Sequence, residues 1–351
     1  MLCIQCIQPD KVTGVRVPDS AYEKLSEYQF FTGNIAELIP AAGVLPYDLI
    51  SPLFSDYSYK ERFVWMPEGM AATYAQEHVL DFPVGAVLIK HFYYHQDERN
   101  HALGRRLIET RLLINRGIEW DAYGYTWNDE QTEAYYDVAG SIKDVSWINA
   151  AGEERKVDYI IPNKNQCKGC HAYDNKLKPI GPKVRNINRG FAYPDGRANQ
   201  LAKWQSVGYL TGYDDLADHP SVAQWDNVAA DLQARSMAYL DINCGHCHNP
   251  DGAGRTSGLT LLADADLGLK VGVYKPTVSA GAGTGGHSFS IVPGDASQSI
   301  MIYRMSSTNP GAMMPELGRR MVHQEGVDLI ANWINNMDQD AFEAPKDLSL
   351  N

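Results

Sequence analysis

The stretch Asn243-Cys-Gly-His-Cys-His248, together with its earlier counterpart Cys167-Lys-Gly-Cys-His171, decides how this chain is expected to fold. In each stretch two residues separate a pair of cysteines, and a histidine follows the second cysteine directly. A chain of this composition would contain one such pattern by chance roughly 0.003 times, so the occurrence of two indicates chemistry rather than coincidence.

The C-x-x-C-H spacing is the attachment signature of c-type heme. Two thiols three positions apart can form thioethers with the two vinyl groups of one porphyrin, and the adjacent histidine then becomes the proximal ligand of the iron. The sequence therefore predicts two covalently attached heme c groups. Their thioether anchors would be Cys167, Cys170, Cys244 and Cys247, and their proximal ligands would be His171 and His248.

A structural zinc site built from the two cysteine pairs is the main alternative. The pairs begin 77 residues apart, at Cys167 and Cys244, whereas four-cysteine zinc sites usually separate their pairs by about 15–20 residues. Zinc would also not require a histidine after each pair. The spacing therefore favours heme over zinc.

The second heme has a candidate for its sixth ligand in Met313-Met-Pro315. Methionine is a soft, flexible ligand that raises the reduction potential of a heme. Met314 is 66 residues beyond His248, which leaves ample chain to pass around a porphyrin. We therefore predict Met314 as the ligand and Met313 as the second choice, while Met321 lies too close to the expected closing helix.

The first heme lacks an equivalent methionine, because none occurs between His171 and Met237. Its sixth ligand could instead be a lysine, a tyrosine, a residue of a second molecule, or nothing. Histidines could also reach it from elsewhere in the chain, and the candidates are His78, His91, His95, His101 and His219. The sequence does not decide among these alternatives.

Residue patterns on either side of the motifs predict a multidomain α+β fold. Apolar and aromatic runs separated by turn residues predict a β-rich domain, like a sandwich or jelly roll, over 45–162. Helical periodicity in Asp231–Asn243 and Val327–Met337 predicts helices that cross over a heme, as in an all-α cytochrome c domain. The expected divisions are an N-terminal extension at 1–44, the β-rich domain at 45–162, a reduced first heme-binding segment at 163–227 and the all-α domain at 228–351.

Composition excludes several classes of partner. The 351 residues are 44% hydrophobic and carry 31 basic against 43 acidic side chains, a formal charge of −12. Nucleic acid and anionic membrane surfaces are therefore poor partners for the surface as a whole. The apolar run Val84–Ile89 stops at Lys90, far short of the roughly 18 residues of a membrane span. Partner proteins should instead present a basic face, or bind at a local positive patch around a heme edge.

The part of the chain at 228–340 resembles a class I cytochrome c domain. The segments that carry this resemblance are the helix leading into Asn243–His248, then Ile291-Val-Pro-Gly294, Met313-Met-Pro315 and Gly326-Val-Asp-Leu-Ile-Ala-Asn-Trp-Ile334. In that class a Gly-Pro pair follows the heme motif by about a dozen residues. Gly181-Pro182 fits this spacing after His171, whereas the missing methionine departs from the pattern.

About 85% of the chain resembles a bacterial family of exported diheme c-type cytochromes with a β-rich N-terminal region. The matching segments are Leu53-Phe-Ser-Asp56, Phe82-Pro-Val-Gly85, Thr126-Trp-Asn-Asp-Glu-Gln-Thr132, Pro179-Ile-Gly-Pro182 and Asn199-Gln-Leu201. This resemblance implies two covalently bound hemes and an electron-transfer role, and brings no settled reaction.

Covalent heme attachment in bacteria follows export, so we expect a periplasmic, extracellular or cell-surface location. Met1–Asp10 has neither a basic region nor an apolar stretch of 7–15 residues, so the sequence shows no leader. Cys3 and Cys6 lack a following histidine. Three interpretations of this pair are open: a disulfide, the remains of a leader or a lipid-modified terminus.

Three functions are open at this stage. The first is electron transfer between redox proteins, such as an exported dehydrogenase and another cytochrome or a terminal reductase. The second is a peroxidase-like enzyme in which an open first heme activates a small ligand. The third is a binding role for the β-rich domain, with a protein or carbohydrate partner. The heme motifs favour electron transfer, with no catalytic residue assigned.

Overall fold

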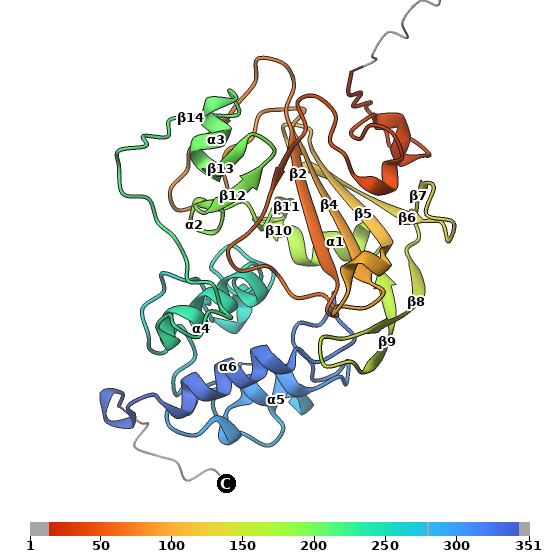
Figure 1. The fold of residues 1–351 in the computed structure, drawn as a ribbon. Helices are drawn as coiled ribbons and strands as arrows, with labels where there is room; N and C mark the ends of the chain where they lie inside the picture. Colours follow the sequence, from red (N-terminus) through yellow and green to blue (C-terminus); the bar gives the residue numbers. More distant parts are fainter. Residues whose placement is uncertain (1–13, 279–280, 344–351) are drawn as a thin grey trace, which may run out of the picture.

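A computed structural model describes residues 14–278 and 281–343. The largest sheet has six strands and occupies the upper part of Figure 1, and the C-terminal helices lie beneath it. The strands up to the first motif are β1 (Leu45–Tyr47), β2 (Tyr59–Trp65), β3 (Ala72–Thr73), β4 (Val87–His95), β5 (Arg105–Asn115), β6 (Trp120–Trp127), β7 (Ala134–Tyr136), β8 (Ser141–Ile148) and β9 (Glu154–Ile161).

Six of these strands form an antiparallel sheet in the order β1-β2-β4-β5-β6-β7. Successive residues of a strand point to opposite faces of a sheet, so each strand supplies two different surfaces. In β4, Val87 and Ile89 join one apolar cluster while Leu88 joins another. The sheet therefore packs on both faces.

The segment before β1 covers the first face. Its aromatic side chains, among them Tyr28 and Phe30, pack with Ile89 and Tyr125 of the sheet. Part of this segment forms the 3₁₀ turns Leu25–Tyr28 and Ile35–Glu37. The first face is thus closed by the chain's own N-terminal part.

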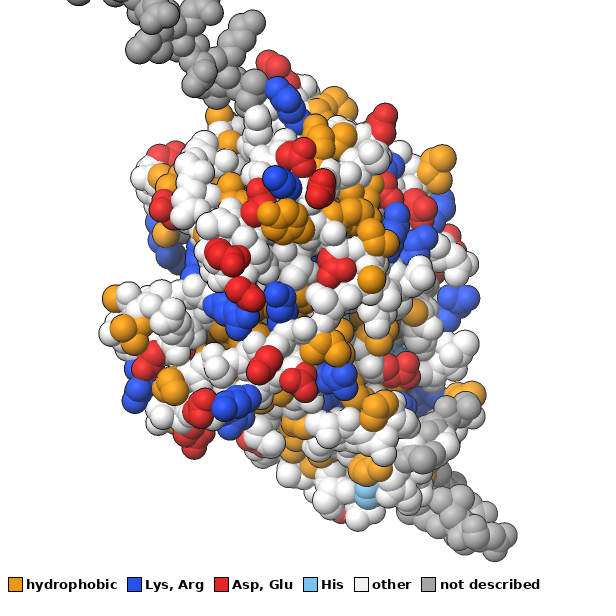
Figure 2. All heavy atoms as spheres, turned by 90° about the vertical axis from the view of Figure 1, so that its right-hand side faces the viewer, with side chains coloured by type: hydrophobic (Ala, Val, Ile, Leu, Met, Phe, Trp, Pro, Cys, Tyr) orange, Lys and Arg blue, Asp and Glu red, His pale blue; other side chains and the backbone are white. Residues whose placement is uncertain are grey.

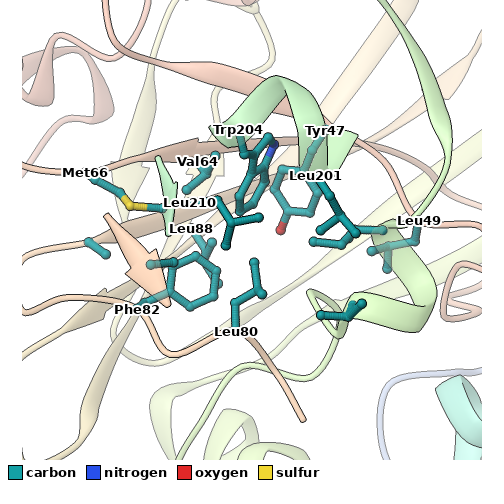
Figure 3. Packing of buried hydrophobic residues seen from close by; sticks show 14 of the residues in the cluster. Tyr47, Leu49, Val64, Met66, Leu80, Phe82, Leu88, Leu201, Trp204 and Leu210 are labelled. Atoms are coloured by element: carbon teal, nitrogen blue, oxygen red, sulfur yellow. The ribbon is translucent and has the colours of Figure 1, made fainter. Parts of the chain in front are cut away.

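The second face divides into three parts along the strands. At one end Val64 and Leu88 pack against Trp204 and its neighbours, as Figure 3 shows. At the other end Phe92 and Tyr94 pack against the hairpin of β8 and β9. The middle part remains available for the site described below.

Short elements follow β9. The strands are β10 (Ala172–Tyr173), β11 (Lys176–Leu177), β12 (Gly190–Tyr193), β13 (Gly196–Asn199) and β14 (Leu210–Thr211). The helices are α1 (Lys164–His171), α2 (Val184–Ile187), α3 (Gln200–Ser206), α4 (Leu232–Leu240), α5 (Ile300–Ser306) and α6 (Gln324–Asn335). A single π-helical turn, Asp241–Gly245, continues α4.

The predicted fold class is wrong. The described chain is β-rich with six short α-helices, and no all-α cytochrome c domain is present in it. The helices expected near 231–243 and 327–337 do form, as α4 and α6, but only turns, bridges and 3₁₀ pieces lie between the second motif and α5. Glycines at positive φ, such as Gly258 and Gly272, interrupt this stretch and prevent further helices. The β region is likewise one large sheet with a hairpin against it, rather than two stacked sheets.

None of the helices in the described ranges is long and apolar enough to cross a membrane. On the face shown in Figure 2, acidic and basic side chains lie interspersed, so the excess of acidic residues does not form a single acidic field there.

His91 of β4 is fully buried on the first face, away from the second motif. Its Nδ1 lies 2.7 Å from the Thr110 hydroxyl, and its ring contacts Phe31 and Phe63 edge-on. Burial lowers the pKa of His91 from 6.5 to about 3, with a smaller contribution from Arg105. The imidazole is therefore neutral in the folded protein at every pH above that value.

This burial makes stability depend on pH. Below 6.5 the unfolded chain takes up a proton at His91 that the folded chain does not, so stability falls by about 1.4 kcal/mol per pH unit. Between pH 7.5 and 5.0 the wild type should lose about 2 kcal/mol more than the His91→Leu variant in urea unfolding. Exposed His78→Leu is the matched control and should keep the wild-type slope. Equal slopes for wild type and His91→Leu would contradict this assignment.

Candidate functional site

The first motif lies on α1, which begins where β9 ends. Asn163 caps the helix: its side chain accepts the Gln166 N–H, and the Gln166 side chain accepts the Asn163 N–H in return. Lys164 forms an ion pair with Asp121 of β6 at 3.1 Å, which fixes α1 against the sheet. Because α1 runs through Cys167, Cys170 and His171, these three side chains stand at helical positions i, i+3 and i+4.

The second motif follows α4 through the π-helical turn. Asp231 caps α4 by accepting the Ala234 N–H at 2.8 Å. The backbone N–H groups of Cys247 and His248 both donate to the Cys244 carbonyl, at 3.0 and 2.9 Å, so the helical turn continues through the motif. Single π-turns within helices occur often at functional sites.

A buried ion cluster holds the second motif to the segment that follows the first. Asp241, just before Cys244, receives hydrogen bonds from Lys183 and Arg185, each at 2.9 Å at the shortest. Burial opposes ionisation of Asp241, but the two cations more than offset it and lower the pKa of the carboxyl. This ion cluster joins the segment after the first motif to the segment before the second motif, and it therefore fixes the two motifs relative to each other.

Both motifs open into one cavity of about 510 Å³, within the roughly 300–1,000 Å³ of cofactor and ligand pockets. Its walls come from the middle part of the second sheet face, from α1, and from the loop between α5 and α6. The motif residues that line it are Cys167, Cys170, His171, Cys244 and His246. Cys247 and His248 are not among the lining residues, although Cys247 lies close enough to Cys170 for the two thiols to interact electrostatically.

All four motif cysteines are free thiols. Burial raises the pKa of each, to about 12 for Cys244 and Cys247, which keeps the thiols neutral. In residues 14–278 and 281–343, no group of three or more His, Cys, Asp or Glu side chains is placed to hold a metal ion. Within these ranges the motif cysteines therefore form two thiol pairs rather than one assembled four-cysteine site.

The motif histidines have their Nδ1 atoms engaged. The Nδ1 of His171 lies 2.8 Å from the Lys178 carbonyl, and that of His248 lies 2.9 Å from the Ser257 hydroxyl. Metal-ligating histidines usually have their second ring nitrogen held in this way, which orients the ring and leaves Nε2 for the metal. Gly254 is required beside His248, because a Cβ there would come within 3.0 Å of the ring.

The predicted ligand Met314 lines the cavity, as do Met313 and Met305, whereas Met321 does not. The Met314 N–H donates to the Arg304 carbonyl at 3.0 Å, and its carbonyl accepts from Arg319 at 2.8 Å. The backbone of Met314 is thus fixed while its side chain is left to face the cavity.

The β domain holds this loop in place. The Asp56 carboxylate accepts the backbone N–H groups of Arg320 and Met321, each at 2.7 Å. Two residues earlier, Phe54 stacks on the His323 ring at 4.2 Å, and its N–H donates to Asn243 at 2.8 Å. The sheet, the second motif and the methionine loop therefore form one connected wall around the cavity.

A row of cations crosses the cavity wall on the sheet. Arg62, Lys90 and Arg111 stand directly opposite one another on β2, β4 and β5 and all line the cavity. Like charges in facing positions repel, so such a row needs anions. Asp48 pairs with Arg62 at 2.6 Å and Glu109 pairs with Arg111 at 2.5 Å.

The row remains incompletely paired within the described chain. The Nη2 atom of Arg62 is buried without a hydrogen-bond partner. Burial, reinforced by Arg62, Lys60 and Arg111, lowers the pKa of Lys90 well below its usual value. An anionic group in the cavity would satisfy these side chains, and the two propionate carboxylates of a porphyrin are such groups. The thiols, the imidazoles, the cavity and this row together fit heme.

The structure also shows what the sequence did not reveal. None of the five histidines proposed for the first heme lines the cavity: His78, His91, His95, His101 and His219. Two unpredicted histidines do, His246 and His323, together with the cation row. The signal for His246 was its position between two cysteines, and the signal for the row was Lys90, which ends an apolar run in a buried strand. Cys3 and Cys6 lie outside the described residues.

Comparison with known proteins adds no relative. No protein family, no curated protein and no solved structure matches this chain. Its function must therefore be argued from the site alone.

Proposed function

We propose that this protein is an exported diheme c-type cytochrome that transfers electrons between redox proteins. The observation that carries the proposal is that two C-x-x-C-H motifs, each on a helical turn, meet at one cavity. When bound, heme supplies a one-electron change at iron between the ferric and ferrous states.

The chain's own residues would bind and orient the two groups. Cys167 and Cys170 would anchor one group, and Cys244 and Cys247 the other. Hydrogen bonds donated by the Nδ1–H groups of the proximal imidazoles, from His171 to the Lys178 carbonyl and from His248 to the Ser257 hydroxyl, would leave Nε2 of each ring to face the metal. Met314 would complete the second centre and raise its potential above that of the first.

The way the chain lines the cavity supports an electron-transfer role. Apolar and hydrogen-bonded walls would hold the groups in fixed positions and limit the reorganisation that a change of charge would require. The proximity of Cys170 to Cys247 would bring the two porphyrins close together. Partners are other cytochromes, a dehydrogenase or a terminal reductase outside the cytoplasm.

Expression with a c-type heme maturation system tests the proposal. We expect two hemes per chain by the pyridine hemochrome assay, and ferric optical and EPR spectra in which both irons are low-spin. Chain that carries no covalent heme after maturation would end the proposal. A peroxidase-like enzyme would instead show one high-spin ferric heme and turnover when the reduced protein is mixed with peroxide.

A further inference from the structure

His246 occupies the second middle position of the second motif, Cys244-Gly-His-Cys-His248. With 3.6 residues per helical turn, residue i+2 points about 200° away from residue i, whereas i+3 and i+4 return to the same side. The turn is helical through the motif, as its backbone hydrogen bonds show. In agreement with this, His246 lines the cavity whereas Cys247 and His248 do not, so the His246 imidazole faces a different side of the turn from these two residues.

The imidazole of His246 lies in the shared cavity with that of His171. Each motif thus contributes one histidine to the lining of the same cavity.

The hydrogen bonding of His246 matches that of a metal ligand. Its Nδ1 lies 3.3 Å from the Ile242 carbonyl, just as the Nδ1 of His171 lies near the Lys178 carbonyl. Within the described parts of the chain its Nε2 has no hydrogen-bond partner, and the same holds for the Nε2 of His171. Two imidazoles thus present free Nε2 atoms to one cavity.

The other side chains of the cavity fit this role less well. His323 donates or accepts at Nδ1 with the Tyr239 hydroxyl at 2.9 Å, and its Nε2 lies 3.7 Å from the Glu325 carboxylate. Lys90 stands between Arg62 and Arg111 in the cation row, which suits it to an anion. Met313 and Met314 belong to the loop beside the second motif.

We propose that His246 is the sixth ligand of the heme held by Cys167 and Cys170, opposite His171. The second motif would then serve two irons, binding one heme through its cysteines and His248 and ligating the other through His246. This inference rests on the proposed diheme cofactor set. It assigns a bis-histidine centre to the first heme, which the sequence left without a sixth ligand.

The test is the spin state of the two irons in the matured protein. Changing His246→Ala should convert half of the ferric heme from low-spin to high-spin by EPR and optical spectroscopy, with two hemes still attached. Added imidazole should restore the low-spin signal, which also shows that the variant is folded. His323→Gln is the matched cavity control and should leave both irons low-spin.

The possible outcomes distinguish a wrong ligand assignment from a wrong proposed function. Two attached hemes with unchanged low-spin spectra in His246→Ala would overturn the ligand assignment and leave the proposed function standing. A high-spin iron in the wild type, or one that arises in His323→Gln but not in His246→Ala, would overturn it as well. Absence of heme from the wild type would instead reject the proposed function.

Discussion

Replacing Cys167 and Cys170 together by alanine is expected to halve the heme content, from two groups per chain to one. Covalent attachment depends on the thiols of one motif, and each motif stands on its own helical turn, α1 or the turn after α4. The double replacement of Cys244 and Cys247 should remove the other heme in the same way. Intact-chain mass spectrometry and the pyridine hemochrome assay both count the groups.

The chain supplies its own control for this experiment. Cys3 and Cys6 have the same C-x-x-C spacing without a following histidine, so replacing both by alanine should leave two hemes attached. Loss of both hemes from either motif variant would contradict two independent attachment sites. Retention of two hemes in both variants would contradict the cysteine assignment itself.

Local features of the fold were predictable from the sequence. The helix at α4 follows from the Asp231 cap and the apolar spacing behind it, and α6 follows from the periodicity of Val327–Met337. Both signals depend on residues within a few turns of each other. The mistake was to extend them into an all-α domain, because the long stretch between the motif and α5 is held by glycine turns and backbone hydrogen bonds instead.

The site was predictable only in part, for a similar reason. The cysteines and histidines of each motif are neighbours in sequence, so their spacing reveals them. The cation row depends on the pairing of three strands. The sequence around Arg62, Lys90 or Arg111 does not predict that these residues face one another. Alternation within a strand predicts which face a residue occupies, but not which residue of another strand lies opposite.

For His246, the sequence predicts the side of the turn that the residue occupies but not the residues that it contacts. Helical geometry alone places it on a different side of the turn from Cys247 and His248, and this could have been derived from the sequence. What it faces there depends on how α4 sits against α1 and the sheet, which the buried cluster of Asp241, Lys183 and Arg185 determines. Tertiary contacts of this kind bring His246 and His171 to the same cavity, and the motif sequence alone does not predict this.

Changing Met314→His is expected to lower the reduction potential of the second heme by about 0.2 V, a quarter of the roughly 0.8 V range that axial ligands span. Methionine raises the potential because it donates weakly and stabilises the ferrous iron, whereas imidazole favours the ferric state. Since the backbone of Met314 is fixed by Arg304 and Arg319, a histidine side chain at this position would start from the same place on the cavity wall. Potentiometric titration followed optically measures the shift.

Met313 is the matched control, because it is the adjacent methionine and lines the same cavity. Met313→Leu should keep both potentials and the low-spin spectrum, while Met314→Leu should make the second iron high-spin. The opposite result, a spin change in Met313→Leu alone, would transfer the ligand role to Met313. If neither variant altered a heme, the loop between α5 and α6 would only pack against the porphyrin, and the higher potential assigned to the second centre would lose its physical basis.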